Sequence, residues 1–113
     1  MKTARALALL GLLSGGGCWP SHPPAPEEVA LDRYDESEKM FAAGAYADAA
    51  PGYEFAIKAR HLWKDPYVKL ARCHEALGRE DLAVQVLQRL LEVDRTDEEG
   101  LRALARLQAL RKP

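Results

Sequence analysis

Apolar residues recur at helical spacing, and not at strand spacing, from about Leu31 to the C-terminus. In residues 65–78 they fall on one face of a predicted helix. An N-cap followed by a first-turn proline, Asp65-Pro66, predicts the start of this helix, and Gly78 predicts its end. The face consists of Tyr67, Leu70, Ala71, His74 and Leu77.

The next helical segment has a much wider apolar face. Its apolar residues span about 180° at 100° per residue and leave only polar residues outside. A face this wide must contact more than one neighbour, as in stacked helical hairpins. The apolar set is Leu82, Ala83, Val86, Leu87, Leu90, Leu91 and Val93, and the polar set is Gln85, Gln88, Arg89 and Glu92.

Two further helices are less regular. The helix that contains Pro51 is acceptable only if it begins near Asp48, which puts the proline in the first turn. A last helix begins near Asp97, with Asp97 or Thr96 as its cap. Its leucines recur every three residues and drift about 60° at each step. We expect Leu101 and Leu104 to cover the preceding helices, and Leu107 and Leu110 to stay partly exposed.

The chain contains an internal repeat. The segments FAAGAYADAAPGYEFAI, from Phe41, and EALGREDLAVQVLQRLL, from Glu75, align at an offset of 34 residues. The offset pairs Gly44 with Gly78, Ala49 with Ala83, Tyr53 with Leu87, and Ala56 with Leu90. Two helices around a glycine turn with this period resemble the tetratricopeptide repeat.

The resemblance covers roughly residues 30–97. It implies an all-α fold in which antiparallel helical hairpins stack as a short right-handed solenoid. Two repeats (30–63 and 64–97) would be followed by a C-terminal capping helix (97–113). In the second repeat Arg95 replaces the family's terminal proline, and in the first Arg33 and Glu36 occupy apolar positions. The other matches are Ser37, Tyr46 and Tyr53 in the first repeat and Tyr67, Leu70, Ala71 and His74 in the second.

Two repeats are fewer than the three or so that a stable solenoid usually needs. Marginal stability, self-association and a stabilising partner are therefore all expected alternatives.

The first 17 residues have the order of a secretory signal. Lys2 and Arg5 are followed by a short apolar segment and then by the small residues 14–17. The apolar segment is too short to span a bilayer, which needs about 20 residues. Residues 18–29 follow as a proline-rich spacer, in which Pro20–Pro26 cannot form a helix.

The junction at Cys18 resembles the bacterial lipobox, although the family favours leucine where Gly15 stands. The resemblance implies cleavage before Cys18 and acylation of that residue, which would anchor the chain stably. Because Trp19 and not Asp follows, it also implies the periplasmic face of the outer membrane. Ordinary cleavage after a small-x-small triplet, which would give a secreted protein, and an uncleaved anchor are the alternatives.

The composition and the absence of known motifs argue against nucleic-acid binding and against several classes of enzyme. The chain of 113 residues has a formal net charge of −1, which argues against nucleic-acid binding. It contains no metalloprotease, P-loop, serine-hydrolase or dinucleotide motif, so we expect no enzyme, cofactor or metal. Cys73 and His74 point about 100° apart on a helix and are assigned to packing. A thiol–imidazole pair and a Cys18–Cys73 disulfide are the alternatives, and lipidation of Cys18 would exclude the disulfide.

The family's function is partner binding, usually in a groove lined by the first helix of each pair. By resemblance, the groove here would contain a basic stripe beside an aromatic end, suited to an acidic or C-terminal carboxylate peptide. The chaperone-type carboxylate clamp is absent, and a solvated helix face is the alternative. The predicted groove residues are Tyr34, Phe41, Val68, Lys69, Arg72, Arg102 and Arg106, with Glu38 and Glu75 between them.

The sequence thus predicts a bacterial lipoprotein that acts as a protein–protein interaction scaffold at the cell envelope. Two alternatives remain. The first is a pilotin-like or secretion-associated accessory dedicated to one envelope subunit, and the second is a regulatory or peptidoglycan-associated subunit.

Overall fold

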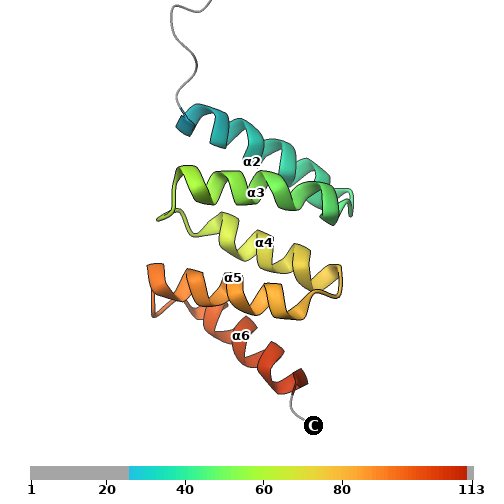
Figure 1. Ribbon diagram of the computed structural model, residues 1–113, viewed down its shortest axis with the longest axis vertical. Coiled ribbons are helices and arrows are strands. Elements are labelled where there is room, and N and C mark those ends of the chain that lie inside the picture. Colours follow the sequence, from blue (N-terminus) through green and yellow to red (C-terminus); the bar gives the residue numbers. More distant parts are fainter. Residues whose placement is uncertain (1–25, 112–113) are drawn as a thin grey trace, which may run out of the picture.

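The computed structural model describes residues 26–111, and these residues form helices joined by short turns and loops (Figure 1). The predicted all-α fold is confirmed. The helices are α2 (Pro26–Ala42), α3 (Tyr46–Ala59), α4 (Asp65–Ala76), α5 (Glu80–Val93) and α6 (Glu98–Arg111).

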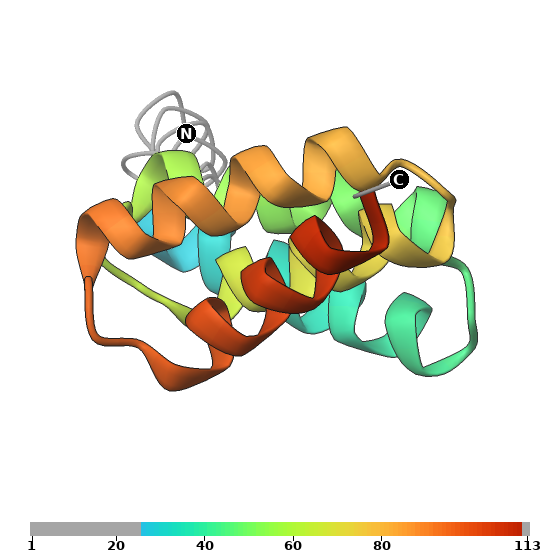
Figure 2. The same ribbon diagram turned by 90° about the horizontal axis from the view of Figure 1, so that it is seen from below.

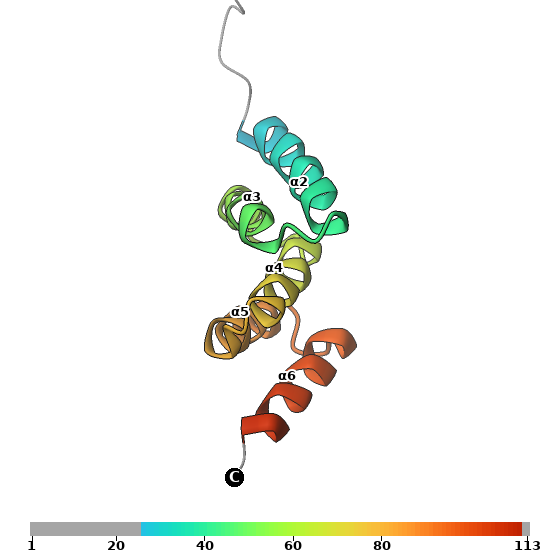
Figure 3. The ribbon, with the colours of Figure 1, turned by 90° about the vertical axis from the view of Figure 1, so that its right-hand side faces the viewer.

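Successive helices run antiparallel and pack against one another in chain order, from α2 to α6. Figure 3 shows that α3 and α5 lie on one side of the stack, with α2 and α6 on the other. Figure 2, which looks along the stack, shows the same two layers. The arrangement is a short helical solenoid of two hairpins, α2–α3 and α4–α5, followed by a single helix.

The two hairpin turns are built alike. Gly44 has a φ of +81° and Gly78 a φ of +73°, a conformation that side chains disfavour. In each turn the amide after the glycine donates to a carbonyl five residues earlier: Ala45 to Met40 at 2.8 Å, and Arg79 to His74 at 2.7 Å. These backbone bonds end α2 and α4, and the repeated geometry accounts for the sequence period.

The core follows the same period. Ala49 and Ala83 are both fully buried, so their small side chains let each second helix approach its neighbours closely. Tyr53 and Leu87, which the 34-residue offset pairs, are among the largest fully buried side chains. Buried hydrophobic side chains of both hairpins form one continuous cluster that extends to Leu107 in α6.

The starts of α2 and α4 differ from the predictions. Residues 26–29, assigned above to the spacer, are the first turn of α2, because proline is tolerated at the first helical position and Glu27 and Glu28 favour a helix N-terminus. Asp65 is the first residue of α4 and not its N-cap, and no side-chain cap bond is present there. At α6 the predicted cap is confirmed, since Asp97 Oδ2 accepts a 2.8 Å hydrogen bond from the Gly100 amide.

Pro51 lies inside its helix. Because α3 begins at Tyr46, the predicted start near Asp48 is wrong, and Pro51 belongs to the second turn. The proline leaves the Ala47 carbonyl without its usual amide donor. Both residues are exposed, so water can solvate that carbonyl.

The capping helix is rotated relative to the prediction. Leu107 is buried, whereas Leu101 is 46% exposed, the reverse of what we expected for both residues. The cause is Gly100, whose missing side chain lets α6 pack against Leu90 and Leu91 of α5. Leu110 is exposed and Leu104 half-buried, as expected.

The predicted apolar face of α5 also needs correction. Leu82, which the prediction placed on it, is 41% exposed, while Val84, which the prediction left out, is buried.

No helix within residues 26–111 is long and apolar enough to cross a membrane. The predicted signal segment (1–17), Cys18, Trp19 and the spacer up to residue 25 lie outside the described residues.

Candidate functional site

A pocket of about 320 Å³ opens between α4, α5 and α6. Its apolar residues come from all three helices, and charged residues from α4 and α6 surround them. Four of the predicted groove residues, Val68, Arg72, Arg102 and Arg106, meet here. The apolar residues are Val68, Ala71, Leu87 and Ala103, and the charged ones are Arg72, Glu75, Glu99, Arg102 and Arg106.

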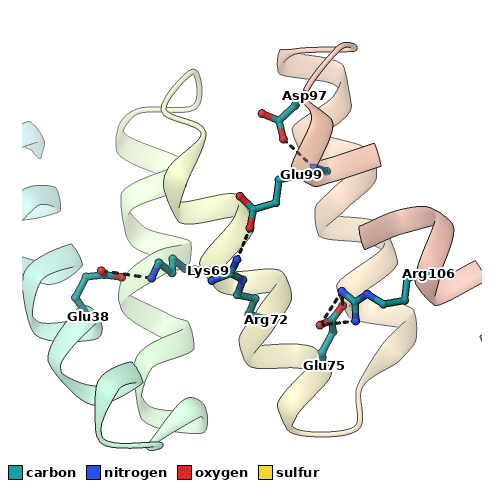
Figure 4. A network of polar contacts seen from close by, with 8 residues as sticks. Glu38, Lys69, Arg72, Glu75, Asp97, Glu99 and Arg106 are labelled. Carbon is teal, nitrogen blue, oxygen red and sulfur yellow. Dashed lines mark hydrogen bonds and ion pairs between the residues drawn. The ribbon is translucent and has the colours of Figure 1, made fainter. Parts of the chain in front are cut away.

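Ion pairs join α4 to α6 across this pocket (Figure 4). Arg106 Nη2 lies 3.0 Å from Glu75 Oε1, and Arg72 pairs with Glu99. Arg102 pairs within α6 with Glu98, at 3.1 Å. Each guanidinium of the predicted basic stripe therefore has a carboxylate partner.

A third interhelix pair lies further along the groove, between α2 and α4. Lys69 Nζ is 3.6 Å from Glu38 Oε2 and 4.8 Å from the centre of the Phe41 ring. Glu38 also accepts a 2.6 Å hydrogen bond from the Tyr53 hydroxyl. Burial, followed by this hydrogen bond, raises the pKa of Tyr53. Carboxylates thus pair with the basic side chains along the whole predicted stripe. This corrects the expectation of an open basic surface.

The aromatic end of the predicted groove is packed into the first hairpin. Tyr34 lies 4.4 Å from the Trp63 ring and 5.5 Å from the Tyr53 ring, between centroids. Phe41 makes an edge contact with Tyr46 at 5.2 Å. Burial, and then the nearby Glu38 carboxylate, raises the pKa of Tyr34 to about 12. Tyr34 and Phe41 are half-buried, so they support the fold and present only part of their surface to the groove.

Sequence reasoning missed the role of Glu99. The acidic run Asp97-Glu98-Glu99 at the start of a helix suits the helix dipole, yet Glu99 also reaches across to Arg72 on α4. A signal was present, because Glu99 precedes Arg102 by three residues and Arg106 by seven, which places all three on one helical face.

The Cys73–His74 pair shows the environment of a packed core. Cys73 is a fully buried free thiol, and burial raises its pKa to about 11. His74 is half-buried, and its Nδ1 has no hydrogen-bond partner among residues 26–111. Burial, and then Arg79, lowers the pKa of His74. Within those residues no group of three or more His, Cys, Asp or Glu side chains could hold a metal ion.

Comparison with known proteins agrees with this architecture. A tetratricopeptide repeat family model matches residues 40–107. Among solved structures, the chain resembles the first TPR of Spaghetti (RPAP3) bound to the HSP90 peptide SRMEEVD, with a TM-score of 0.50 and 17% sequence identity. The likeness covers 82% of this chain and 100% of that one, and it supports the fold. No curated protein matches the chain.

Proposed function

The chain belongs to the tetratricopeptide repeat family, and from this premise we propose that it is a protein-binding adaptor held at the cell envelope by a lipid on Cys18. Domains of this family generally act as non-enzymatic protein–protein interaction scaffolds.

The pocket between α4 and α6 is the observation that carries the binding part of the proposal. Its apolar residues suit one aliphatic or aromatic side chain of a bound peptide, and its charged rim suits polar groups on either side. Peptide recognition of this kind needs one buried anchor and a few well-placed polar contacts.

The Arg72–Glu99 pair is the part of the rim that a ligand can displace. Both side chains are about half exposed, at 50% and 53%, and exposed ion pairs contribute little to stability. A ligand carboxylate can therefore take the place of Glu99 at small cost and gain a charge-assisted hydrogen bond from Arg72. Glu75, at 20% exposure, is held more firmly by Arg106.

The ligand proposed here is therefore a peptide with an apolar residue next to an acidic one. The first TPR of Spaghetti, which has a similar fold, is bound to an HSP90 peptide, SRMEEVD, which also combines apolar and acidic residues.

The tether rests on the sequence. A charged start, a short apolar segment and small residues before Cys18 support export followed by lipidation. Trp19 after the cysteine supports the outer membrane's periplasmic face. The residues between Cys18 and α2 would hold the binding module close to the membrane that carries the lipid.

Crosslinking in the native cell tests the binding surface. A photoreactive residue in place of Arg102, on the pocket rim, is expected to capture a partner. The same residue in place of Gln88, exposed on α5 and not part of the pocket lining, is the matched control. Arg72→Glu should lower capture from position 102 without loss of helicity, measured by circular dichroism. Equal capture from both positions would contradict the groove.

Metabolic labelling with a radioactive fatty acid tests the tether. The unsubstituted chain is expected to take up label and to sediment with outer membranes. Cys18→Ser should abolish labelling, while Cys73→Ser, at the chain's other cysteine, should leave it unchanged. Labelling that persists in Cys18→Ser would show that the lipid is elsewhere, and an unlabelled, released wild-type chain would favour plain secretion.

A further inference from the structure

The loop between α3 and α4, residues 60–64, lies at the same end of the helices as the first turn of α2. Glu27 of that turn and Leu62, Trp63 and Lys64 of the loop line one open hollow. Figure 1 shows the loop on the same side of the stack as the start of α2. The folded module therefore begins, at Pro26, beside this loop.

The loop is a preformed turn. The Trp63 amide donates to the Arg60 carbonyl at 3.0 Å, and the Tyr67 hydroxyl donates to the His61 carbonyl at 2.7 Å. The Trp63 ring also packs against the Tyr34 ring, tilted by 43°. These contacts fix the backbone on both sides of Leu62, so little conformational entropy is lost if Leu62 is bound.

Leu62 is the most exposed large hydrophobic side chain within residues 26–111, at 69%. Beside it, the Arg60 guanidinium lies 5.3 Å from the centre of the Trp63 ring. An aliphatic tip flanked by an indole and a guanidinium matches the water–lipid interface, where Trp residues and long cationic side chains place their polar ends among the headgroups.

We propose that the 60–64 loop is a second contact of this protein with the membrane, in which Leu62 inserts at the lipid surface. The inference rests on the proposed lipidation of Cys18. Eight Cα–Cα steps separate Cys18 from Pro26, a reach of at most about 29 Å. A lipidated Cys18 therefore keeps the end of the module that bears this loop close to the bilayer.

The loop orients the module and does not recruit it. One leucine is too small an apolar surface to hold a free protein on a membrane. The anchor makes the second contact intramolecular, so its effective concentration is high and a weak interaction suffices. Glu27, Glu28 and Asp65 lie at the same end and offset Arg60, so the contact depends on lipid tails more than on anionic headgroups.

With this end on the membrane, the axes of the helices point away from the surface. The α4–α5 turn, around Gly78, then lies on the far side. The groove residues Arg72, Glu75 and Arg106 lie on the sides of α4 and α6 and remain open to a partner (Figure 4).

Depth-dependent fluorescence quenching tests the inference. The chain has two tryptophans, so Trp19→Phe leaves Trp63 as the single reporter. The full chain, extracted from the cells that make it, is reconstituted in phosphatidylethanolamine–phosphatidylglycerol vesicles that carry bromine on the acyl chains. We expect brominated vesicles to quench Trp63, and Leu62→Asp to reduce quenching to the level of unbrominated vesicles. Leu82→Asp, at an exposed leucine near the opposite end of the helices, is the control, and Trp63 should still be quenched in this variant.

Vesicle flotation, measured on the same samples, separates the two proposals. A chain that floats while Trp63 stays unquenched would overturn the loop contact and leave the lipid anchor standing. Equal quenching in the wild-type and Leu62→Asp chains would also overturn it. A chain that does not float would overturn the anchor, and the loop contact with it.

Discussion

The hydroxyl of Ser37 on α2 occupies the space in which a β-carbon on Gly52 of α3 would lie. Ser37 Oγ is fully buried there and donates a 2.8 Å hydrogen bond to the Ala49 carbonyl. The first hairpin is therefore closed by two small residues, one from each helix, at its closest approach.

Gly52→Ala is expected to destabilise the protein by about 1–3 kcal/mol, the usual cost of overpacking a close contact. The new methyl group would overlap Ser37 Oγ and would lie 2.9 Å from the Arg33 carbonyl oxygen, so α2 must move away from α3. Urea denaturation followed by circular dichroism measures the change.

The partner substitution provides the control. In Gly52→Ala/Ser37→Ala the hydroxyl is removed, so part of the loss should be recovered relative to Gly52→Ala alone. A stabilised Gly52→Ala protein would contradict the close contact, because alanine favours an unconstrained helix over glycine by about 1 kcal/mol.

Cys73 is expected to resist thiol reagents in the folded protein. It is fully buried, and with a pKa of about 11 only about a thousandth of the thiol is ionised at pH 8. In a Cys18→Ser chain, labelling by Ellman's reagent should therefore require unfolding and become rapid in denaturing urea.

A cysteine at Ala76, exposed on the same helix, gives the matched control in a Cys18→Ser/Cys73→Ala background and should react at once. Rapid labelling of native Cys73 would show that the hydrophobic core around this thiol opens readily, and it would reopen a catalytic or disulfide role for it.

Lys64 ties the start of α4 to the loop after α5, and this contact should depend on pH. Its amine lies 2.8 Å from Asp94 Oδ2 and 3.4 Å from Asp97 Oδ1. The hydrogen bond from Lys64, helped by Thr96, lowers the pKa of Asp94 from 3.8 to about 2, and the pKa of Lys64 is raised in turn. A carboxyl group whose pKa is lowered on folding stabilises the fold at pH values above its ordinary pKa. This stabilisation is lost as the pH falls through the pKa of the folded state. A lysine whose pKa is raised on folding stabilises the fold at pH values below its ordinary pKa of 10.5. This stabilisation is lost as the pH rises through the higher pKa of the folded state.

Lys64→Met should therefore lower the melting temperature at pH values between the pKa of Asp94 and that of Lys64. The difference in melting temperature between the variant and the wild type should vanish as the pH approaches 2. Thermal melts of both proteins at several pH values measure that difference. Because other carboxylates also titrate in acid, the test is the difference between the proteins and not the acid sensitivity of either. A difference that stays constant down to pH 2 would assign the effect to lost packing of the lysine stem.

The sequence predicted the features of this fold that depend on local geometry. Gly44 and Gly78 had to be turns because their backbone conformation excludes most side chains, and Ala49 and Ala83 had to be small for the helices to approach. The rotation of α6 could not be predicted, because four leucines at equal spacing offer several faces and Gly100 decides between them. The ion pairs of the groove could not be predicted for the same reason, since the partner of Arg72 depends on where that rotation places Glu99.

The leucines of α6 give the sharpest test of its rotation. Leu107 is 2% exposed and joins the core cluster, so Leu107→Ala should cost about 2–5 kcal/mol, the range for a buried leucine. Leu101→Ala and Leu110→Ala, at 46% and 66% exposure, should change stability by no more than about 0.5 kcal/mol. Urea denaturation compares the three proteins, and hydrogen exchange shows whether Leu107→Ala loosens α6 alone or both hairpins. A larger loss from Leu101→Ala than from Leu107→Ala would mean that α6 packs through the face expected from its spacing, which would also separate Glu99 from Arg72 and remove the pocket.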